Sequence, residues 1–353
     1  KGNVTDPLDA IEKYGTDALR YTVVAGSSPG NDQRLTDQRL EASRNFANKL
    51  WNASRFVLTS LEDSDNLAAP SAGSHSASED RWILSRTERL VASYDDLMQR
   101  FELAEAARQV RDFFWDEYAD WYIELAKIRM RAGDRTPAAV LVHVLDRLLR
   151  LMHPVMPFVT EAIWQRLIDV RPDPDGRPAL ILASFPVADE SLLDADAERD
   201  LTAVQDFVRA IRNTRAEKNV DAGHWVEAYI VAAEATEATR ATAEAIEVLS
   251  RARPLHIVGS TDDVPSDGVV TSVLPVGRVV LPMAGLFDLD AERERLGKQI
   301  EEARANVAQI EKKLSNEQFV ERAPEQVVQT ERDRLATAQA RFEGLEQSLT
   351  EIG

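Results

Sequence analysis

The stretch that decides the fold lies early in the chain and reads Arg44-Asn45-Phe46-Ala47-Asn48-Lys49-Leu50-Trp51-Asn52-Ala53-Ser54-Arg55-Phe56. Phe46, Leu50, Ala53 and Val57 recur at the spacing of one face of an α-helix. We therefore expect one long helix whose apolar face is buried against other helices. This pattern predicts a helical bundle.

A neighbouring face of the same helix carries Asn45, Lys49, Asn52 and Phe56. Amides can hydrogen-bond base edges, an ammonium group can meet a phosphate, and an aromatic ring can stack on an unpaired base, as in the recognition of single-stranded RNA loops. A polar stripe is also the ordinary solvent side of a helix, and spacing by itself favours that second interpretation.

Length and composition narrow the class of protein. A chain of 353 residues is too long for one ordinary core, so two to four units are expected. The absence of cysteine excludes disulfides and cysteine zinc sites, and no apolar run reaches the ~18 residues that cross a bilayer. We expect a cytoplasmic protein without membrane segments. The net charge of -18 argues against a protein that coats nucleic acid, so any such role needs local basic patches.

The opening residues have the signals of two short helices. Asp6-Pro7 predicts the start of the first and Gly15 its end, and Thr16-Asp17 starts the second, which runs to Val24. Residues 64–79 read as a loop or linker. Helical periodicity then continues over 80–94, 101–132, 138–152 and 157–170. The aromatic residues between Phe113 and Tyr122 are spaced as bundle core.

The fold class changes after the break at 171–178 and a short extended segment at 180–186. A helix is predicted over 195–219 and a second one up to Leu249. Strands are predicted over 225–231, 255–258, 269–274 and 277–281. These elements indicate a small α+β module.

The last part of the chain has a heptad pattern. Leu289, Leu296, Ala303 and Ile310 begin it, and Val328 and later residues repeat it after a break that contains Pro324. The two halves are predicted to form an antiparallel helical hairpin with arms about 40 Å long, at ~1.5 Å per residue.

The sequence offers no catalytic machinery or metal site. No pair of carboxylates or Ser/His/Asp set stands out, and the five histidines lack ligand spacing. Basic residues that could contact an RNA backbone occur on a helix and along the hairpin, although solvated charge runs look the same. These candidates are Arg212, Arg215, Lys298, Arg304, Lys312, Lys313, Arg334 and Arg341.

Several motifs, taken in order, resemble the C-terminal part of bacterial valyl-tRNA synthetases, which are class I aminoacyl-tRNA synthetases. They lie at Lys1 to Val4 with Asp6-Pro7, Tyr14 to Arg20, Arg44 to Asn52, Trp115 to Lys127, His153 to Phe158, Ile211 to Glu217 and Lys313 to Pro324. The chain starts at Lys1, after the place of the KMSKS motif, and lacks the HIGH motif and the editing insertion. We therefore expect a piece of a longer enzyme.

The resemblance implies a mainly α architecture in four parts. Residues 1–37 are expected to be a stem-contact segment that follows the catalytic domain, 38–186 an anticodon-binding helical bundle, 187–286 a small α+β junction domain, and 287–353 an antiparallel coiled-coil arm that packs on the tRNA elbow. The family's anticodon-contacting positions fall on Lys49 and Phe56, and we include Asn45, Asn52, Arg44 and Arg55 as their neighbours.

The implied partner is tRNA(Val), and a monomer is expected. The parent enzyme attaches valine to this tRNA with ATP and Mg²⁺ and edits mischarged threonine, whereas this piece by itself is expected to bind tRNA without catalysis or a cofactor. Two alternatives stay open. One is a non-catalytic helical scaffold whose hairpin binds another protein, and the other is the same part of an isoleucine-specific synthetase.

Overall fold

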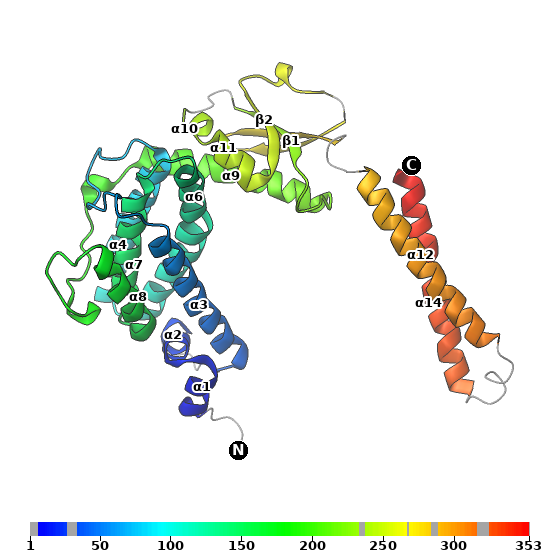
Figure 1. Cartoon of the computed structure of the whole chain (residues 1–353), viewed down its shortest axis with the longest axis horizontal. Coiled ribbons are helices and arrows are strands. Elements are labelled where there is room, and N and C mark those ends of the chain that lie inside the picture. Colours follow the sequence, from blue (N-terminus) through cyan, green and yellow to red (C-terminus); the bar gives the residue numbers. More distant parts are fainter. Residues whose placement is uncertain are drawn as a thin grey trace. The chain divides into compact units, whose positions relative to one another are not determined.

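The structure, a computed structural model, describes residues 6–26, 34–232, 237–266, 268–283, 289–315 and 325–352. The chain is mainly helical, with one small sheet and a C-terminal helix pair (Figure 1). It divides into two compact units, one made of Lys1–Val208 with Glu234–Leu249 and the other of Arg209–Ala233 with Ser250–Gly353. The predicted fold class is confirmed. The four-part division stays a prediction.

Two short helices begin the described chain, α1 (Pro7–Tyr14) and α2 (Thr16–Gly26). The carboxylate of Asp6 accepts the N–H of Leu8 at 2.8 Å, which caps α1. Gly15 has a φ of 90°, so glycine suits the end of this helix. The predicted limits of both helices are confirmed to within two residues.

Helix α2 is fastened to the end of the bundle by two of its side chains. The Asp17 carboxylate accepts the N–H groups of Phe158 and Val159 at 3.2 and 2.6 Å, at the start of α8 (Pro157–Val170). Arg20 donates to the carbonyls of Pro154 and Val155, each at 3.0 Å. The bonds of Asp17 satisfy N–H groups in the first turn of α8, which have no partner within that helix, and those of Arg20 hold the connection between α7 (Pro137–Met152) and α8.

The bundle contains the long helix predicted around Phe46 and Leu50. Its helices are α3 (Asp37–Thr59), α4 (Ser78–Gln99), α5 (Leu103–Asp112), the π-helix η1 (Phe113–Tyr122), α6 (Ile123–Arg131), α7 (Pro137–Met152) and α8. Phe46 is 1% exposed and its ring lies 5.8 Å from that of Phe114, which in turn lies 6.0 Å from Tyr118. The predicted apolar face of α3 therefore packs into an aromatic core, except that Ala53 is half-buried.

Two predictions of local structure need correction. Residues 101–132 do not form one regular α-helix, because η1 interrupts them and Phe101 has a φ of 59°. The segment predicted as extended forms a 3-10 turn at η2 (Leu180–Leu182). A single extended segment without a neighbouring strand leaves its backbone groups unpaired, whereas this turn bonds the N–H of Leu182 to the carbonyl of Ala179 at 3.0 Å.

The second unit holds a four-stranded sheet in the order β2-β1-β4-β3. Its strands are β1 (Val226–Val231), β2 (Ala252–Val258), β3 (Val269–Leu274) and β4 (Gly277–Pro282). Strands β1 and β2 are parallel, with Tyr229 beside His256, and the other pairs are antiparallel. Gly277 is required in the β3–β4 turn, because a Cβ there would lie 2.4 Å from the carbonyl oxygen of Val231.

Helices flank the sheet in sequence. They are α9 (Ala195–Glu217), α10 (Glu237–Ala241) and α11 (Ala243–Ser250), with short 3-10 turns at η3 (Glu190–Leu192) and η4 (Thr261–Asp263). The predicted helix up to Leu249 is thus present as two pieces, and the predicted strands are confirmed with shifts of at most three residues.

The hairpin consists of α12 (Leu289–Leu314) and α14 (Glu325–Ile352), which pack against each other. Lys313 pairs with Glu331, and Arg304, earlier in α12, pairs with Glu346, later in α14. The two helices are therefore antiparallel, as predicted (Figure 1). The predicted turn at 315–320 and Pro324 lies, apart from Ser315, outside the described residues. Within the described part of the chain, no helix is long and apolar enough to span a membrane.

Candidate nucleic-acid interface

The polar face of α3 meets the π-helix η1 through Lys49. The ammonium Nζ of Lys49 lies 4.2 Å from the ring centroid of Trp115 and 2.5 Å from a carboxylate oxygen of Asp120. An ammonium over an indole face is attracted by the negative face of the ring. Lys49 is thus held at the surface by one aromatic and one acidic partner.

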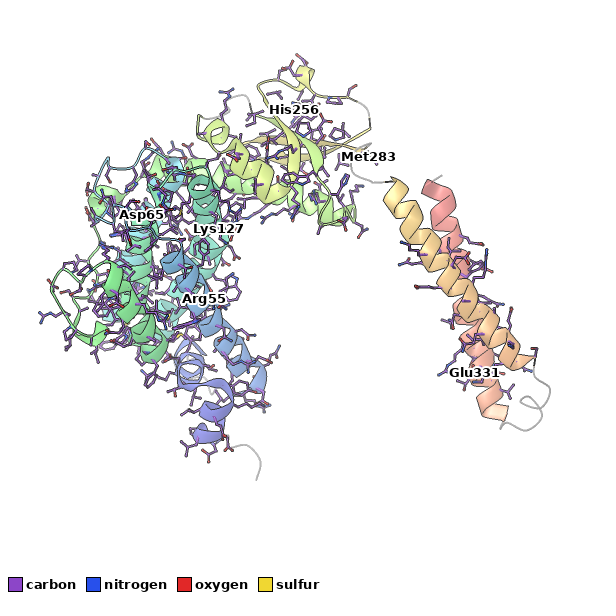
Figure 2. All side chains as sticks on the ribbon, viewed as in Figure 1. Arg55, Asp65, Lys127, His256, Met283 and Glu331 are labelled. Atoms are coloured by element: carbon purple, nitrogen blue, oxygen red, sulfur yellow. The ribbon has the colours of Figure 1, made fainter. Side chains whose placement is uncertain are left out.

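A second lysine covers the other predicted contact residue. The Nζ of Lys127, on α6, lies 4.5 Å from the ring centroid of Phe56 and 2.6 Å from the carboxylate of Glu124. Figure 2 labels Lys127 on α6 and Arg55, the sequence neighbour of Phe56, on α3. Phe56 is half-buried, so its ring is not enclosed in the bundle core. The predicted orientation of Lys49 and Phe56 toward the surface agrees with this geometry.

Together these residues form one continuous feature, which we call the cation–aromatic surface. Its members are Asn45, Lys49, Asn52 and Phe56 of α3, Trp115 and Asp120 of η1, and Lys127 of α6. Both amides are exposed. The surface offers amide groups, two ammonium groups, two aromatic rings and, with Glu124 beside Lys127, two carboxylates. These are the groups that bind unpaired bases and loop phosphates.

The contribution of η1 to this surface was not predicted from the sequence. The spacing of a regular α-helix assigns Trp115 to the core. In η1 the i→i+5 bonds widen the turn, so Phe114 and Tyr118 stay inside while Trp115 is half-exposed and Asp120 is exposed. The stretch Trp115 to Lys127 belongs to the family resemblance, and this is the one signal that could have pointed to it.

Buried ion pairs fix η1 and α6 in place. The hydroxyl of Tyr122 and the guanidinium of Arg129 donate to the same carboxylate oxygen of Asp80, at 2.7 and 2.8 Å. Burial by itself would raise the pKa of Asp80, but hydrogen bonds from His75 and Arg129 hold it below its ordinary value. Burial raises the pKa of the neighbouring Glu79. This network links α4 to the helices that carry Tyr122 and Lys127.

The structure does not bring Arg44 and Arg55 to the cation–aromatic surface. The guanidinium of Arg44 pairs with Glu41 at 2.9 Å and lies 5.7 Å from the ring centroid of Tyr14. Arg55 lines a pocket with Trp51 and residues of α8. Successive residues of a helix are turned by about 100°, so sequence neighbours of Lys49 and Phe56 point elsewhere.

Arg212 and Arg215 also separate. Arg212 is exposed, whereas Arg215 is 7% exposed. The guanidinium of Arg215 donates to the carbonyls of Asp221, His224 and Arg251 at 2.9, 2.7 and 3.0 Å. A buried side chain bound in this way holds the start of the sheet together. Its placement does not support the predicted contact with a phosphate.

Three basic residues of the hairpin pair with acids of the hairpin. Lys313 and Arg334 both pair with Glu331, at 2.8 and 3.1 Å. Arg304 pairs with Glu301 at 3.2 Å, and its guanidinium lies 5.6 Å from the ring centroid of Phe342. Lys298 and Lys312 are exposed. The side chain of Arg341 lies outside the described ones. Among the described residues no cluster of His, Asp or Glu could hold a metal ion.

Comparison with known proteins gives two family matches. Residues 80–230 match the anticodon-binding domain of tRNA ligase, and residues 288–353 match the valyl tRNA synthetase tRNA binding arm. The first match contains η1 and α6 of the cation–aromatic surface, and the second contains the hairpin.

Curated relatives agree with these matches. The chain is 45% identical to the valine–tRNA ligase of Dehalococcoides mccartyi over 337 residues, which are 95% of this chain and 38% of that protein. It is 38% identical to that of Enterococcus faecalis over 94% of this chain and 37% of that protein. It is 35% identical to that of Bacillus subtilis over 99% of this chain and 40% of that protein.

The chain thus spans about two fifths of the length of these relatives. The matches are collinear with nearly the whole chain, and they include the specific arm as well as the general anticodon-binding domain. The chain therefore belongs to the valyl-tRNA synthetase family, in which it corresponds to the C-terminal region with the anticodon-binding domain and the tRNA-binding arm.

Proposed function

We propose that this chain is the tRNA-recognition part of a valine–tRNA ligase and that its cation–aromatic surface binds the anticodon loop of tRNA(Val). The observation that carries the proposal is the pairing of each ring with a lysine, Lys49 over Trp115 and Lys127 over Phe56. Unpaired loop bases stack on aromatic rings, while nearby cations bind the phosphates between them.

Each member of the surface has a chemical role in this proposal. Phe56 stacks on a splayed anticodon base. Lys49 and Lys127 bind phosphate or base oxygens, and their positions over rings limit the side-chain entropy that binding costs. The exposed amides of Asn45 and Asn52 reach base edges. The carboxylate of Asp120 accepts a hydrogen bond from a base amino group once Lys49 has turned to the RNA.

The remaining parts of the chain extend this contact along the tRNA. The α1–α2 segment, which Asp17 and Arg20 fasten to the bundle, contacts a stem of the tRNA. The hairpin binds the tRNA elbow. We propose that the whole ligase activates valine with ATP and Mg²⁺, transfers it to tRNA and edits threonine. This region recognises the tRNA.

The test is the affinity of the full 353-residue chain for a transcript of tRNA(Val), for the same transcript with a substituted anticodon, and for a non-cognate tRNA. We expect the cognate transcript to bind most tightly. Phe56→Ala should weaken its binding about tenfold or more, since one base–aromatic stack is worth roughly 1–3 kcal/mol. The matched control is Phe101→Ala, which removes a phenyl ring that is 84% exposed at a turn outside this surface.

Two results would count against the proposal. Equal affinity for the cognate and anticodon-substituted transcripts would remove the anticodon role. Equal losses for Phe56→Ala and Phe101→Ala would show that Phe56 acts as an ordinary surface ring. Binding of a protein partner without any RNA binding would favour the scaffold alternative.

A further inference from the structure

An exposed tryptophan with two arginines lies at one end of the small sheet. Trp225 directly precedes β1 and is 38% exposed. The guanidinium carbon of Arg251 lies 5.7 Å from a ring centroid of Trp225, and that of Arg253 lies 4.9 Å from it. Both arginines are exposed. Arg251 directly precedes β2, the edge strand beside β1, and Arg253 is its second residue. The indole thus serves as a floor on which two guanidinium groups are held.

The backbone at Arg251 has an unfavourable conformation that neighbouring hydrogen bonds hold in place. Arg251 has a φ of 53°, in the left-handed region that residues other than glycine rarely adopt. Its carbonyl accepts the N–H of Val226 at 3.0 Å and a guanidinium N–H of the buried Arg215 at 3.0 Å. Arg215 also holds the carbonyl of His224, next to Trp225, at 2.7 Å. The buried Arg215 therefore fixes the backbone next to Trp225 and the backbone of Arg251.

Positive charge is concentrated here in a protein with a net charge of -18. Burial lowers the pKa of Arg215, and the charge of nearby Arg251 lowers it further. Acidic groups are close by as well. The charge of Asp221 partly opposes the lowering of the Arg215 pKa, while the carboxylate of Glu227 accepts the hydroxyl of Tyr229 at 2.8 Å and lies 3.0 Å from His256. The two exposed guanidinium groups of Arg251 and Arg253, held over one indole, favour an anionic ligand.

We propose that Arg251 and Arg253, held over Trp225, bind phosphate oxygens of an RNA backbone. The guanidinium group is planar and suited to two-point binding of phosphate, and its stacking on an indole reduces the flexibility that binding costs. The ring faces serve the arginines, so Trp225 positions them and is not a stacking platform for bases. The matched family regions end at residue 230 and resume at 288, so neither contains these two arginines.

This proposal rests on the proposed tRNA binding and adds a contact in the α+β module. The experiment measures binding of the full chain to the tRNA(Val) transcript over a range of salt concentrations. The variants are the double substitution Arg251→Gln with Arg253→Gln, and Trp225→Ala with Trp225→Phe. Arg278→Gln is the matched control, because Arg278 is exposed on β4 of the same sheet and its substitution removes the same kind of charge.

We expect the double variant to bind roughly tenfold more weakly at low salt, with the slope of log affinity against log salt reduced by about one to two. Trp225→Ala should lose part of this affinity and Trp225→Phe should keep it. Arg278→Gln should have little effect. Circular dichroism and thermal unfolding check that each variant is folded.

A negative result for the proposed function can be told apart from a negative result for this site. If the wild-type chain binds no RNA, both the proposed function and this site are overturned. If it binds tRNA(Val) and the double variant binds with the same affinity and salt slope, only this site is overturned, and an acidic protein segment becomes the ligand to test. An equal loss of affinity in the double variant and in Arg278→Gln would show that the loss comes from the overall charge of the protein. That result would also overturn the site.

Discussion

The helical bundle and the hairpin both carry many ion pairs, but they bury them to different degrees. In the bundle, the side chain of Asp80 is 1% exposed and that of its partner Arg129 is 19% exposed. In the hairpin, the side chains of Lys313 and Arg334 are 47% and 67% exposed, and only that of their shared partner Glu331, at 8%, is buried. A buried pair cannot exchange its partner for water without a large cost, whereas an exposed pair can.

If the chain binds tRNA as proposed, this difference predicts two modes of RNA contact. The bundle uses its buried pairs to hold a rigid surface, on which the two lysines lie over aromatic rings. In the hairpin, Arg304, Lys313 and Arg334 form exposed pairs with its own acids, which phosphates could replace on binding. Contact with the bundle should therefore depend on base stacking and contact with the hairpin on salt.

The largest expected effect comes from breaking the buried pair. Arg129→Met should lower the free energy of unfolding of the bundle by about 3–5 kcal/mol, because it leaves the carboxylates of Asp80 and Glu79 buried without their cation. Urea unfolding followed by tryptophan fluorescence measures this change, since Trp82, Trp121 and Trp164 are buried in the bundle.

Lys313→Met is the matched change in the hairpin. It should shift the unfolding midpoint too little to resolve beside the shift of Arg129→Met, since exposed pairs contribute little. Comparable shifts for the two variants would erase the proposed difference between the regions.

Removal of the hairpin is the next largest change. A chain that ends before residue 288 should bind tRNA(Val) more weakly, with the slope of log affinity against log salt reduced by about one for each phosphate that the hairpin binds. The residual binding should depend less on salt and should still distinguish anticodon variants. Identical affinity and slope with and without residues 288–353 would assign the hairpin to another partner.

The pH dependence of the free energy of unfolding is expected to be a smaller effect. It concerns His143 in the bundle core. Burial lowers the pKa of His143 below its ordinary value of 6.5, although the carboxylate of Glu88 opposes this shift. The unfolded chain therefore takes up a proton at His143 more readily than the folded one as the pH falls below about 6.5.

The free energy of unfolding should accordingly fall as the pH drops from 7 to 5.5, and His143 should add no pH dependence above that range. Urea unfolding of wild type and His143→Gln at several pH values checks this. His143→Gln should have a weaker pH dependence in this range, provided that His153, whose pKa burial also lowers, is unchanged. An equal pH dependence in both proteins would show that another group is responsible.

Much of the fold followed from local patterns. The spacing of Phe46 and Leu50 predicted the buried side of α3, the Asp6-Pro7 and Gly15 signals predicted the limits of α1, and heptads predicted the hairpin. These predictions succeed because helix periodicity and capping depend on residues within a few positions of one another.

The candidate site was only partly predictable. The stripe of Lys49 and Phe56 could be read from α3, but Trp115 and Lys127 come from elements about seventy residues away in sequence. The π-helix turns Trp115 outward, and no local pattern had indicated that change of period. Arg215 and Arg212 are three positions apart, yet packing buries one and exposes the other.

The sequence by itself therefore determined the fold class, the family and the stripe of α3 that carries Lys49 and Phe56. The tertiary structure decided which partners meet that stripe, which arginines are structural, and that Trp225, Arg251 and Arg253 come together. The physical reason is the range of the forces. Periodicity and caps act within one or two helical turns, whereas burial and charge pairing depend on elements that meet only after the chain has folded.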